Sequence, residues 1–254
     1  MIKSRRLAKF KIIKHAFFNR LGGKSTGIFK GLNCGSGSSD NKKNILKNLK
    51  IVSNKINTKS NKIVLLNQVH SNKFYYISKN SRLNNNSKFE GDALITNRRN
   101  LPIAVLTADC APILIYDKNI KMVAAIHAGW KGAFKNIVNK VIKFMIKKGC
   151  SPENMTAVIG PCISVNNYEV KKDFVKKFIK KNKSAKKFFK ITERKNYFDL
   201  SKYIHNQLKS LDIKKIDIIN KDTFNIKNNF FSARRSISRN ESDYGRNISI
   251  IMIN

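Results

Sequence analysis

"TADCAPILIYDKNIKMVAAIHAGWKG", residues 107–132, contains two apolar runs with the length and composition of buried β-strands. Cys110 stands just before the first run, and His127 ends the second. A two-residue turn at Lys118–Asn119, or a four-residue loop centred on it, predicts a hairpin in which Cys110 lies directly opposite His127. Opposed side chains share one face of a sheet, with their Cβ atoms roughly 4.5–5.5 Å apart. A thiolate and an imidazole placed in this way can bind one metal ion or share a proton.

The predicted pairing depends on the turn. A three-residue loop would shift the register by one residue and put Cys110 and His127 on opposite faces. Pro112 has no backbone donor, so it marks a strand start, an edge or a bulge. The position of Lys118–Asn119 in the loop therefore tests the prediction.

Helix-like and strand-like segments interleave along the whole chain. Apolar residues at helical spacing predict helices over 39–56, 134–146, 170–179 and 199–211. Shorter apolar runs predict strands over 62–69, 73–77, 92–96, 102–106, 112–117, 121–127, 155–160, 215–219 and 247–253. Several of these strands are joined by very short loops, which requires antiparallel pairs beside any crossover connections. We therefore expect an α+β domain with mixed sheets rather than a doubly wound parallel sheet.

The chain is strongly basic, with 52 Lys and Arg against 15 Asp and Glu in 254 residues and a formal charge of +37. Such a charge fits a polyanionic partner such as nucleic acid or a membrane surface. However, the excess is mostly Lys, is spread along the chain, and comes with many Asn and Ile. These three residues share A- and T-rich codons, so we favour compositional drift and do not expect specific nucleic-acid binding.

The four cysteines form no CxxC motif and no paired framework, which fits a reducing cytoplasm. Lys9, Lys11 and Lys14 interrupt any apolar core of a signal peptide near the start of the sequence. The longest apolar stretch, 101–116, contains Asp109 and is too short to span a bilayer. We therefore expect a cytoplasmic protein with no membrane segment.

A second histidine, His70 in "LLNQVHSNKF", closes another apolar run. A lone histidine in such a place is more often structural, but His70 with Cys110 and His127 makes a two-His, one-Cys set. Zn²⁺ accepts these ligands, and three protein ligands leave a fourth position for water or substrate. Water at that position becomes acidic enough to ionise near neutral pH. The alternative chemistry is a Cys110 nucleophile with a histidine base and no metal.

Residues after His127 also suggest a site. Gly129 and Gly132 lie where a strand gives way to a helix, and the backbone N–H groups there can bind an anion. Many such turns carry glycine for packing alone, and Trp130 is as well explained by core packing as by ligand binding. Asp92 and Asp109 are carboxylates at strand ends, where either could instead cap a helix or form a turn.

Several segments together resemble one known family, the YfiH-like, laccase-domain purine nucleoside phosphorylases, formerly called multicopper polyphenol oxidases. The resemblance covers nearly the whole chain. It rests above all on the order of three motifs: "NQVHS" (67–71), "TADC" (107–110) and "HAGW" (127–130). Further matches are "NRLGGKSTGIFKGLN" (19–33), "GDALIT" (91–96), "IGPCIS" (159–164), "YEV" (168–170), "FDL" (198–200) and "FFSARRS" (230–236).

The resemblance implies a single domain over residues 1–254, with mixed sheets packed between helices in α/β/β/α-like layers. It places the metal triad, which is also the catalytic set, on His70, Cys110 and His127. It implies one catalytic Zn²⁺, while copper oxidase chemistry is disfavoured because it needs more histidines than the four present. The implied activities are phosphorolysis of adenosine, inosine, guanosine and methylthioadenosine, and deamination of adenosine. The implied partners are purine nucleosides and phosphate, and no oligomeric state is predicted.

Motif positions and polar chemistry suggest the substrate-binding residues, without any support from spacing. These are Arg20, Ser25, Asn33, Gln68, Asp109, Arg234 and Arg235. The sequence departs from the family pattern at "KDTFN" (221–225), where Asp222 precedes Thr223, and at Ala233, where an aromatic is usual. These departures bear on substrate choice. Two alternative functions remain: a peptidoglycan-editing hydrolase that removes L-serine from cell-wall precursors, and a basic nucleic-acid-binding protein.

Overall fold

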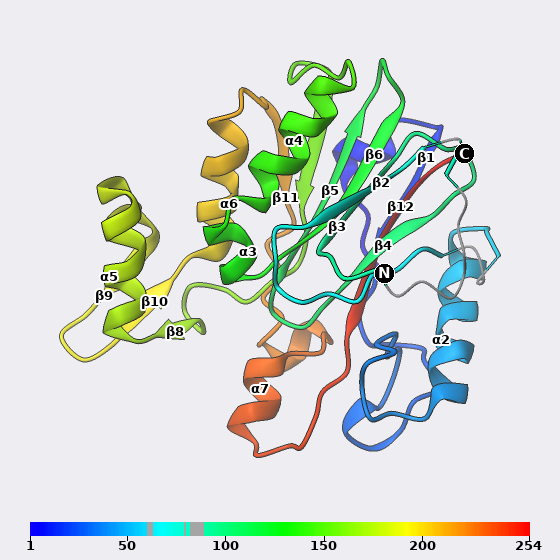
Figure 1. Cartoon of the computed structure of the whole chain (residues 1–254). Helices are drawn as coiled ribbons and strands as arrows, with labels where there is room; N and C mark the ends of the chain where they lie inside the picture. The colour runs from blue at the N-terminus through cyan, green and yellow to red at the C-terminus, as the bar shows by residue number, and fades with distance from the viewer. Residues whose placement is uncertain (60–62, 79, 82–88) are drawn as a thin grey trace.

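The stretch that opens the sequence argument forms the centre of a six-stranded sheet in the computed structural model (Figure 1). The structure describes residues 1–59, 63–78, 80–81 and 89–254. The sheet order is β11-β7-β5-β6-β3-β2, with parallel pairs at both edges and antiparallel pairs between them. Its strands are β2 (Phe74–Ile77), β3 (Ala93–Thr96), β5 (Ala111–Asp117), β6 (Met122–Ala128), β7 (Met155–Ile159) and β11 (Lys215–Ile218).

The hairpin of β5 and β6 is present, but its predicted register is wrong. Pro112, not Cys110, pairs with His127, and Asp117 pairs with Met122. The loop has four residues, 118–121, because the Asp117 carboxylate accepts hydrogen bonds from two backbone N–H groups within it. Lys121 closes this loop in the left-handed region at φ 54°. The partner of His127 thus moves by two residues, which preserves the face and keeps Cys110 near His127.

A second, three-stranded antiparallel sheet packs on the first. Its order is β1-β12-β4, from β1 (Ile13–Phe17), β12 (Asn247–Ile253) and β4 (Ile103–Thr107). Alternation along the strands explains the packing, since Leu114 and Val123 face this sheet while Ile113 and Ala124 face the other way. The space between the sheets is a continuous apolar core.

Helices cover both outer faces. On the free side of the six-stranded sheet lie α3 (Trp130–Phe134), α4 (Ile137–Lys147) and α6 (Leu200–Lys209) (Figure 1). On the free side of the three-stranded sheet lies α2 (Lys42–Lys55), which packs through Val52 and its neighbours. The molecule therefore has four layers, α/β/β/α, and the predicted α+β class with mixed sheets is confirmed.

A lobe extends from one side of these layers (Figure 1). It contains a small sheet of β8 (Glu169–Val170), β10 (Asn196–Phe198) and β9 (Phe189–Ile191), together with α5 (Lys172–Lys181) and the 3-10 helix η3 (Lys183–Phe188). Aromatic side chains fill its interior, with Phe174, Phe178 and Phe198 in mutual contact. The short elements are α1 (Arg5–Ala8), η1 (Gly27–Phe29), η4 (Ile226–Asn228) and α7 (Ala233–Ser238).

Two other predictions differ from the structure. The segment 63–69 of the predicted strand 62–69 makes only isolated bridges at Val64 and Asn67, and residue 62 lies outside the described residues. Backbone hydrogen bonds at these two bridges are supplemented by the Gln68 side chain, which bonds the backbone of Leu106. The predicted helix 134–146 is present as α4 but begins later, at Ile137, because Asn136 adopts a left-handed conformation and leaves Phe134 at the end of α3. Within the described ranges, no helix has the length and apolar character needed to cross a membrane.

Candidate metal centre

His70, Cys110 and His127 converge, although they come from three separate segments. His70 follows the bridge-forming segment 63–69, Cys110 lies in the turn between β4 and β5, and His127 is near the end of β6. Their potential ligand atoms all lie within 4.8 Å of one another. Cys110 Sγ is 3.7 Å from His70 Nε2, and the two imidazole rings meet edge to face with centroids 4.8 Å apart. His127 is buried, Cys110 is partly exposed and His70 is exposed, so the group opens to solvent on one side.

Asp92 fixes two of these three residues. Its carboxylate is fully buried and accepts a hydrogen bond from His127 Nδ1 at 2.8 Å and one from the His70 backbone N–H at 3.0 Å. Ser71 donates to the other carboxylate oxygen through its backbone and its hydroxyl. The His70 backbone is left-handed, at φ 57°, and these bonds hold it there. Because Nδ1 of His127 is committed to Asp92, Nε2 is the nitrogen free to bind a metal.

The charges of the group support one another. Burial opposes ionisation of Cys110, but the neighbouring His127 and His70 outweigh this effect and lower the pKa of the thiol to about 7. Burial likewise opposes the charge of His127, while the Cys110 sulfur and Asp92 raise the pKa of the imidazole to about 9. For Asp92, hydrogen bonds from His127 and Ser71 overcome burial and keep the pKa of the carboxyl below its ordinary value.

Gly129 leaves room for the group. A Cβ atom at this position would lie 2.8 Å from Cys110 Sγ and 2.9 Å from His70 Cδ2. Its backbone is extended, at φ −74° and ψ 172°, so the absence of a side chain serves close approach rather than an unusual conformation. Gly129 is thus the reason that Cys110 and His70 can both reach the end of β6.

The donor set fits zinc. Two imidazole nitrogens and a thiol whose ionisation is favoured are ligands that Zn²⁺ binds, and three of them leave an open position. Tetrahedral donors around zinc stand about 3.3–3.8 Å apart, from the usual bond lengths. The 3.7 Å between Cys110 Sγ and His70 Nε2 meets this spacing, and all three ligand atoms lie within 4.8 Å of one another.

Asp109, next to Cys110, ties α7 to the centre. Its buried carboxylate accepts hydrogen bonds from Thr223 Oγ1, Ser232 Oγ and the Arg234 backbone N–H. Burial raises the pKa of this carboxyl despite those bonds. Asp109 therefore directs its oxygens into the protein and anchors the segment that carries Arg234.

The remaining predicted substrate-binding residues lie at different depths. Gln68 uses both ends of its amide on the backbone of Leu106, and Arg235 donates to backbone carbonyls of Thr223, Phe224 and Phe230. Arg20 donates twice to Lys30 O and lies over the ring of Phe231.

Ser25 and Asn33 belong to a group that we call the loop cluster, made of Ser25, Asn33, Asp40 and Asn48. Ser25 and Asn33 both donate to Asp40, and the Asn48 amide donates to Ser25 Oγ and Asn33 O. Ser25, Asn33 and Asn48 are buried. The polar atoms of the loop cluster are thus largely satisfied by one another and by nearby backbone.

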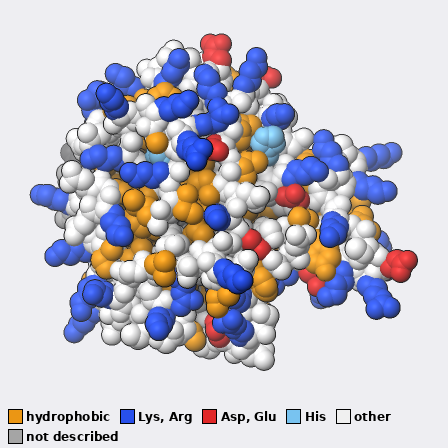
Figure 2. Space-filling model, turned by 180° about the vertical axis from the view of Figure 1, so that it is seen from behind, with side chains coloured by type: hydrophobic (Ala, Val, Ile, Leu, Met, Phe, Trp, Pro, Cys, Tyr) orange, Lys and Arg blue, Asp and Glu red, His pale blue; other side chains and the backbone are white. Residues whose placement is uncertain are grey.

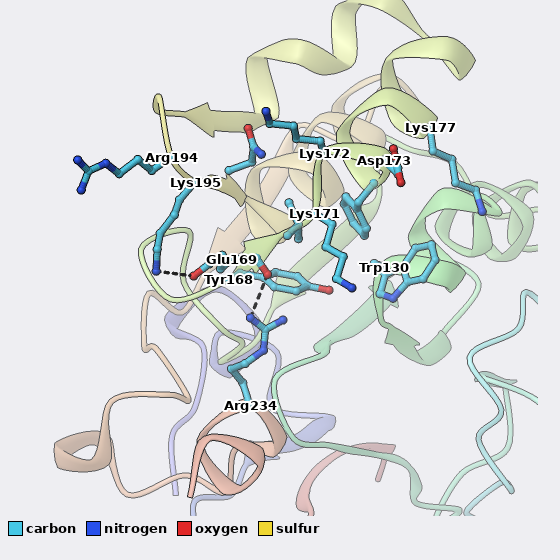
Figure 3. A pocket seen from close by; sticks show the side chains of 13 residues that line it. Trp130, Tyr168, Glu169, Lys171, Lys172, Asp173, Lys177, Arg194, Lys195 and Arg234 are labelled. Carbon is cyan, nitrogen blue, oxygen red and sulfur yellow. Dashed lines mark hydrogen bonds and ion pairs between the residues drawn. The ribbon is translucent and has the colours of Figure 1, made fainter. Parts of the chain in front are cut away.

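A cavity of about 860 Å³ adjoins the centre. Trp130, which directly follows Gly129, lines it on one side, and Arg234 lines it on the other (Figure 3). The remaining wall comes from the lobe, including Tyr168 and Lys171. Among the described residues its lining does not include the three candidate ligands, so the cavity and the centre are neighbours joined through Gly129–Trp130 and Asp109–Arg234.

Sequence reasoning missed most of this environment. The sequence shows Asp92 as a carboxylate at the end of a strand but gives no sign that it bonds His127. It assigns no substrate-binding role to Tyr168 or Lys171, although the matching motif "YEV" (168–170) is a signal for this part of the cavity.

Comparisons with known proteins agree over almost the whole chain. The family model described as multi-copper polyphenol oxidoreductase laccase matches residues 14–254. A Rickettsia conorii protein named purine nucleoside phosphorylase is 37% identical over 213 residues, which are 82% of this chain and 86% of that relative. A Haemophilus influenzae protein of the same name is 32% identical over 241 residues, or 93% of each chain.

Solved structures show the same fold. The hypothetical protein YfiH of Bacillus licheniformis superposes with a TM-score of 0.87 at 26% identity, covering 95% of this chain and 93% of that one. A Neisseria meningitidis protein superposes with a TM-score of 0.83 at 28% identity, covering 96% and 95%.

Proposed function

The chain belongs to the family described as multi-copper polyphenol oxidoreductase laccase, and on this premise we propose that it is a purine nucleoside phosphorylase. Relatives that share 30–37% identity with it over most of its length carry that name. The observation that carries the proposal is the convergence of His70, Cys110 and His127 beside a cavity large enough for a nucleoside.

Zinc is the proposed metal. When bound by His70, Cys110 and His127, it would supply a Lewis acid at the edge of the cavity and lower the pKa of water. Asp92 would orient His127 and His70 for this purpose, as partners of metal-binding histidines do. A copper oxidase remains disfavoured, because the structure gathers two histidines here and the chain has four in all.

Phosphorolysis sets two further demands on the protein. A phosphate oxygen bonds to the ribose C1′ while the C1′–N9 bond breaks. The electron pair of the breaking bond moves to the purine. Cations must therefore hold the phosphate, for which we propose Arg234 and Lys171, which both line the cavity. A hydrogen-bond donor must stabilise the purine anion. Tyr168 suits this role, because burial raises the pKa of its phenol and keeps the proton in place.

The proposal includes adenosine, inosine, guanosine and methylthioadenosine as substrates, with deamination of adenosine as a second reaction. Deamination replaces the amino group at C6 with oxygen from water and releases ammonia. The other predicted residues remain proposed contributors because they fix the loops and α7: Ser25, Asn33, Gln68, Asp109 and Arg235. Arg20 remains one as well, and it lies over the ring of Phe231.

The test is an assay of purified protein with each nucleoside and phosphate, in which free base and inosine are separated by chromatography. We expect the wild type to release free base, and Cys110→Ala to lose at least about 100-fold in kcat/KM with its zinc, since it removes a ligand. Cys150→Ala is the control, because Cys150 is buried against Met122 within the core. It should keep both zinc and activity.

Three outcomes would overturn parts of the proposal. Absence of turnover with every purine nucleoside would refute the phosphorylase assignment. Release of L-serine from a cell-wall precursor, without nucleoside turnover, would favour the peptidoglycan-editing alternative. An active, metal-free protein that depends on Cys110 would favour a thiolate nucleophile, to which the pKa of about 7 is suited.

A further inference from the structure

The cavity beside the metal centre has an aromatic side and a cationic side. The indole of Trp130 and the ring of Tyr168 provide the aromatic surfaces. Cations already rest near both rings, with Lys177 Nζ 5.4 Å from the Trp130 centroid and the Arg234 guanidinium carbon 5.4 Å from that of Tyr168. Figure 3 shows Lys171 extending into the space between these two rings.

These cations have few acidic partners. Glu169 is paired with Lys195 at 3.0 Å, so its charge is already balanced, and Asp173 is the other acid on the lining. Arg234 donates to the backbone carbonyl of Glu169, a neutral partner that orients the guanidinium without cancelling its charge. Lys171, Lys177 and Arg234 thus leave a surplus of positive charge around the aromatic surfaces.

We propose that this cavity binds purine nucleoside 5′-phosphates, with the base against Trp130 or Tyr168 and the phosphate on Lys171, Lys177 and Arg234. This extends the ligand class of the cavity from nucleosides to nucleotides, whose phosphate would occupy the cations proposed above for inorganic phosphate. It rests on the proposed function only for the choice of a purine, because the cations and aromatic rings require only a phosphorylated aromatic ligand.

Size and chemistry together select this ligand. Inorganic phosphate would leave most of a cavity of about 860 Å³ empty and would not use its aromatic walls. A nucleoside alone would use the rings but leave three cations without a partner, and phosphate could fill that place only as a second, separate molecule. A nucleotide uses both, because bases stack on aromatic side chains and phosphates take charge-assisted hydrogen bonds from Lys and Arg.

The overall charge of the protein makes a matched control essential. Twelve Lys and Arg occur between residues 169 and 198, against three Asp and Glu, and Figure 2 shows Lys and Arg spread over the whole visible surface. Any anion will therefore be attracted to some extent. Lys176 and Lys180 are exposed on the same helix, α5, but do not line the cavity. K176Q/K180Q removes the same charge as K171Q/K177Q from the same lobe.

The experiment is a fluorescence titration of the full chain at physiological ionic strength. Trp130 is the only tryptophan, so selective excitation reports on the cavity directly. We expect AMP and ADP to change the emission in a saturable way and to bind at least roughly tenfold more tightly than adenosine. K171Q/K177Q should weaken AMP binding by roughly tenfold or more, and K176Q/K180Q by about twofold at most.

Three results would overturn the inference: equal weakening by the two double variants, adenosine binding as tight as that of AMP, or inorganic phosphate acting at the same concentration as AMP. The proposed function is judged separately. Phosphorolysis of adenosine without AMP binding would refute only the nucleotide site, and AMP binding without nucleoside turnover would refute only the phosphorylase.

Discussion

The metal centre and the loop cluster are both compact groups of polar side chains, yet their atoms are used differently. In the loop cluster, Asn48 donates to Ser25 and Asn33 while its oxygen accepts from the Lys24 backbone. In the metal centre, Asp92 takes one nitrogen of His127, and the remaining ligand atoms point at one another. The polar atoms of the loop cluster are used in hydrogen bonds within the cluster, whereas the metal centre directs three ligand atoms at a common point.

This difference separates fold-stabilising from ligand-binding polar residues. Buried polar groups are normally paired inside the protein, as in the loop cluster. The three ligands of the metal centre instead contact one another, with Cys110 Sγ 3.7 Å from His70 Nε2, and a bound ion would replace these contacts. Variants in the metal centre should therefore lower zinc affinity, whereas variants in the loop cluster should lower the free energy of unfolding.

The largest expected effect is that of Gly129→Ala. The new methyl group would stand in the place now shared by Cys110 Sγ and His70 Cδ2, so zinc affinity should fall by at least about 100-fold. The extended backbone of Gly129 tolerates alanine, so the circular dichroism spectrum should be unchanged. Zinc is measured by competition with a chromogenic chelator. Gly37→Ala, close to the loop cluster and with open space around it, should bind zinc like the wild type.

Asp92→Asn should have the next largest effect. The amide keeps the shape but loses the charge that supports His127, and we expect zinc affinity to fall by roughly 10–100-fold. Asp40→Asn makes the same change in the loop cluster, where Ser25 and Asn33 donate to the carboxylate. Equal zinc affinities in the two variants would remove the distinction between the groups.

Asn48→Ala tests the opposite side of the comparison. It leaves the Lys24 N–H without its acceptor and removes the bonds that Ser25 Oγ and Asn33 O accept, at a cost of about 2 kcal/mol in the free energy of unfolding. Urea denaturation measures this loss, while zinc content should not change. Asn54→Ala, at an exposed position of α2, should stay within about 0.5 kcal/mol of the wild type. A loss of zinc in Asn48→Ala would contradict the assignment.

The smallest effect concerns His15, another histidine whose nitrogen is already used. His15 is buried and its Nε2 accepts from the Ser4 backbone N–H; burial lowers the pKa of the ring to about 4. In the unfolded chain the His15 imidazole takes up a proton below about pH 6.5, whereas in the folded chain it does so only near pH 4. Its contribution to the free energy of unfolding is therefore fully present above pH 6.5 and declines between pH 6.5 and 4. We expect His15 to contribute a loss of about 1 kcal/mol from pH 7.5 to 5.5. His15→Gln should unfold with a correspondingly flatter pH dependence.

The sequence pattern predicted the α+β class with mixed sheets because its strongest apolar runs, such as 112–117 and 247–253, are buried strands, while the layers were implied by the family resemblance. It misjudged segments whose partners are decided by tertiary contacts. The run 63–69 has a strand-like pattern, but the Gln68 amide takes the backbone positions on Leu106 that a neighbouring strand would use. The two- and three-residue strands of the lobe are too short to give a periodic signal.

At the metal centre, the ligands could be identified from their residue types, but not from the predicted register of the β5–β6 hairpin. Cys110 and His127 are neighbours even though the predicted direct pairing was wrong, because the loop 118–121 is centred one residue later than Lys118–Asn119 and shifts the pairing by two residues. The connection of Asp92 to His127 spans 35 residues and two strands, and no local pattern encodes it. The cavity likewise depends on the lobe meeting Trp130 and Arg234 in space.

The buried carboxylate of Asp92 is one case of a wider division of charge. Eight of the ten aspartates accept hydrogen bonds through their side chains: Asp40, Asp92, Asp109, Asp117, Asp199, Asp217, Asp222 and Asp243. The lysines, in contrast, cover the surface (Figure 2). Replacing an exposed lysine should therefore cost little stability, whereas replacing most aspartates would leave hydrogen-bond donors without their acceptor.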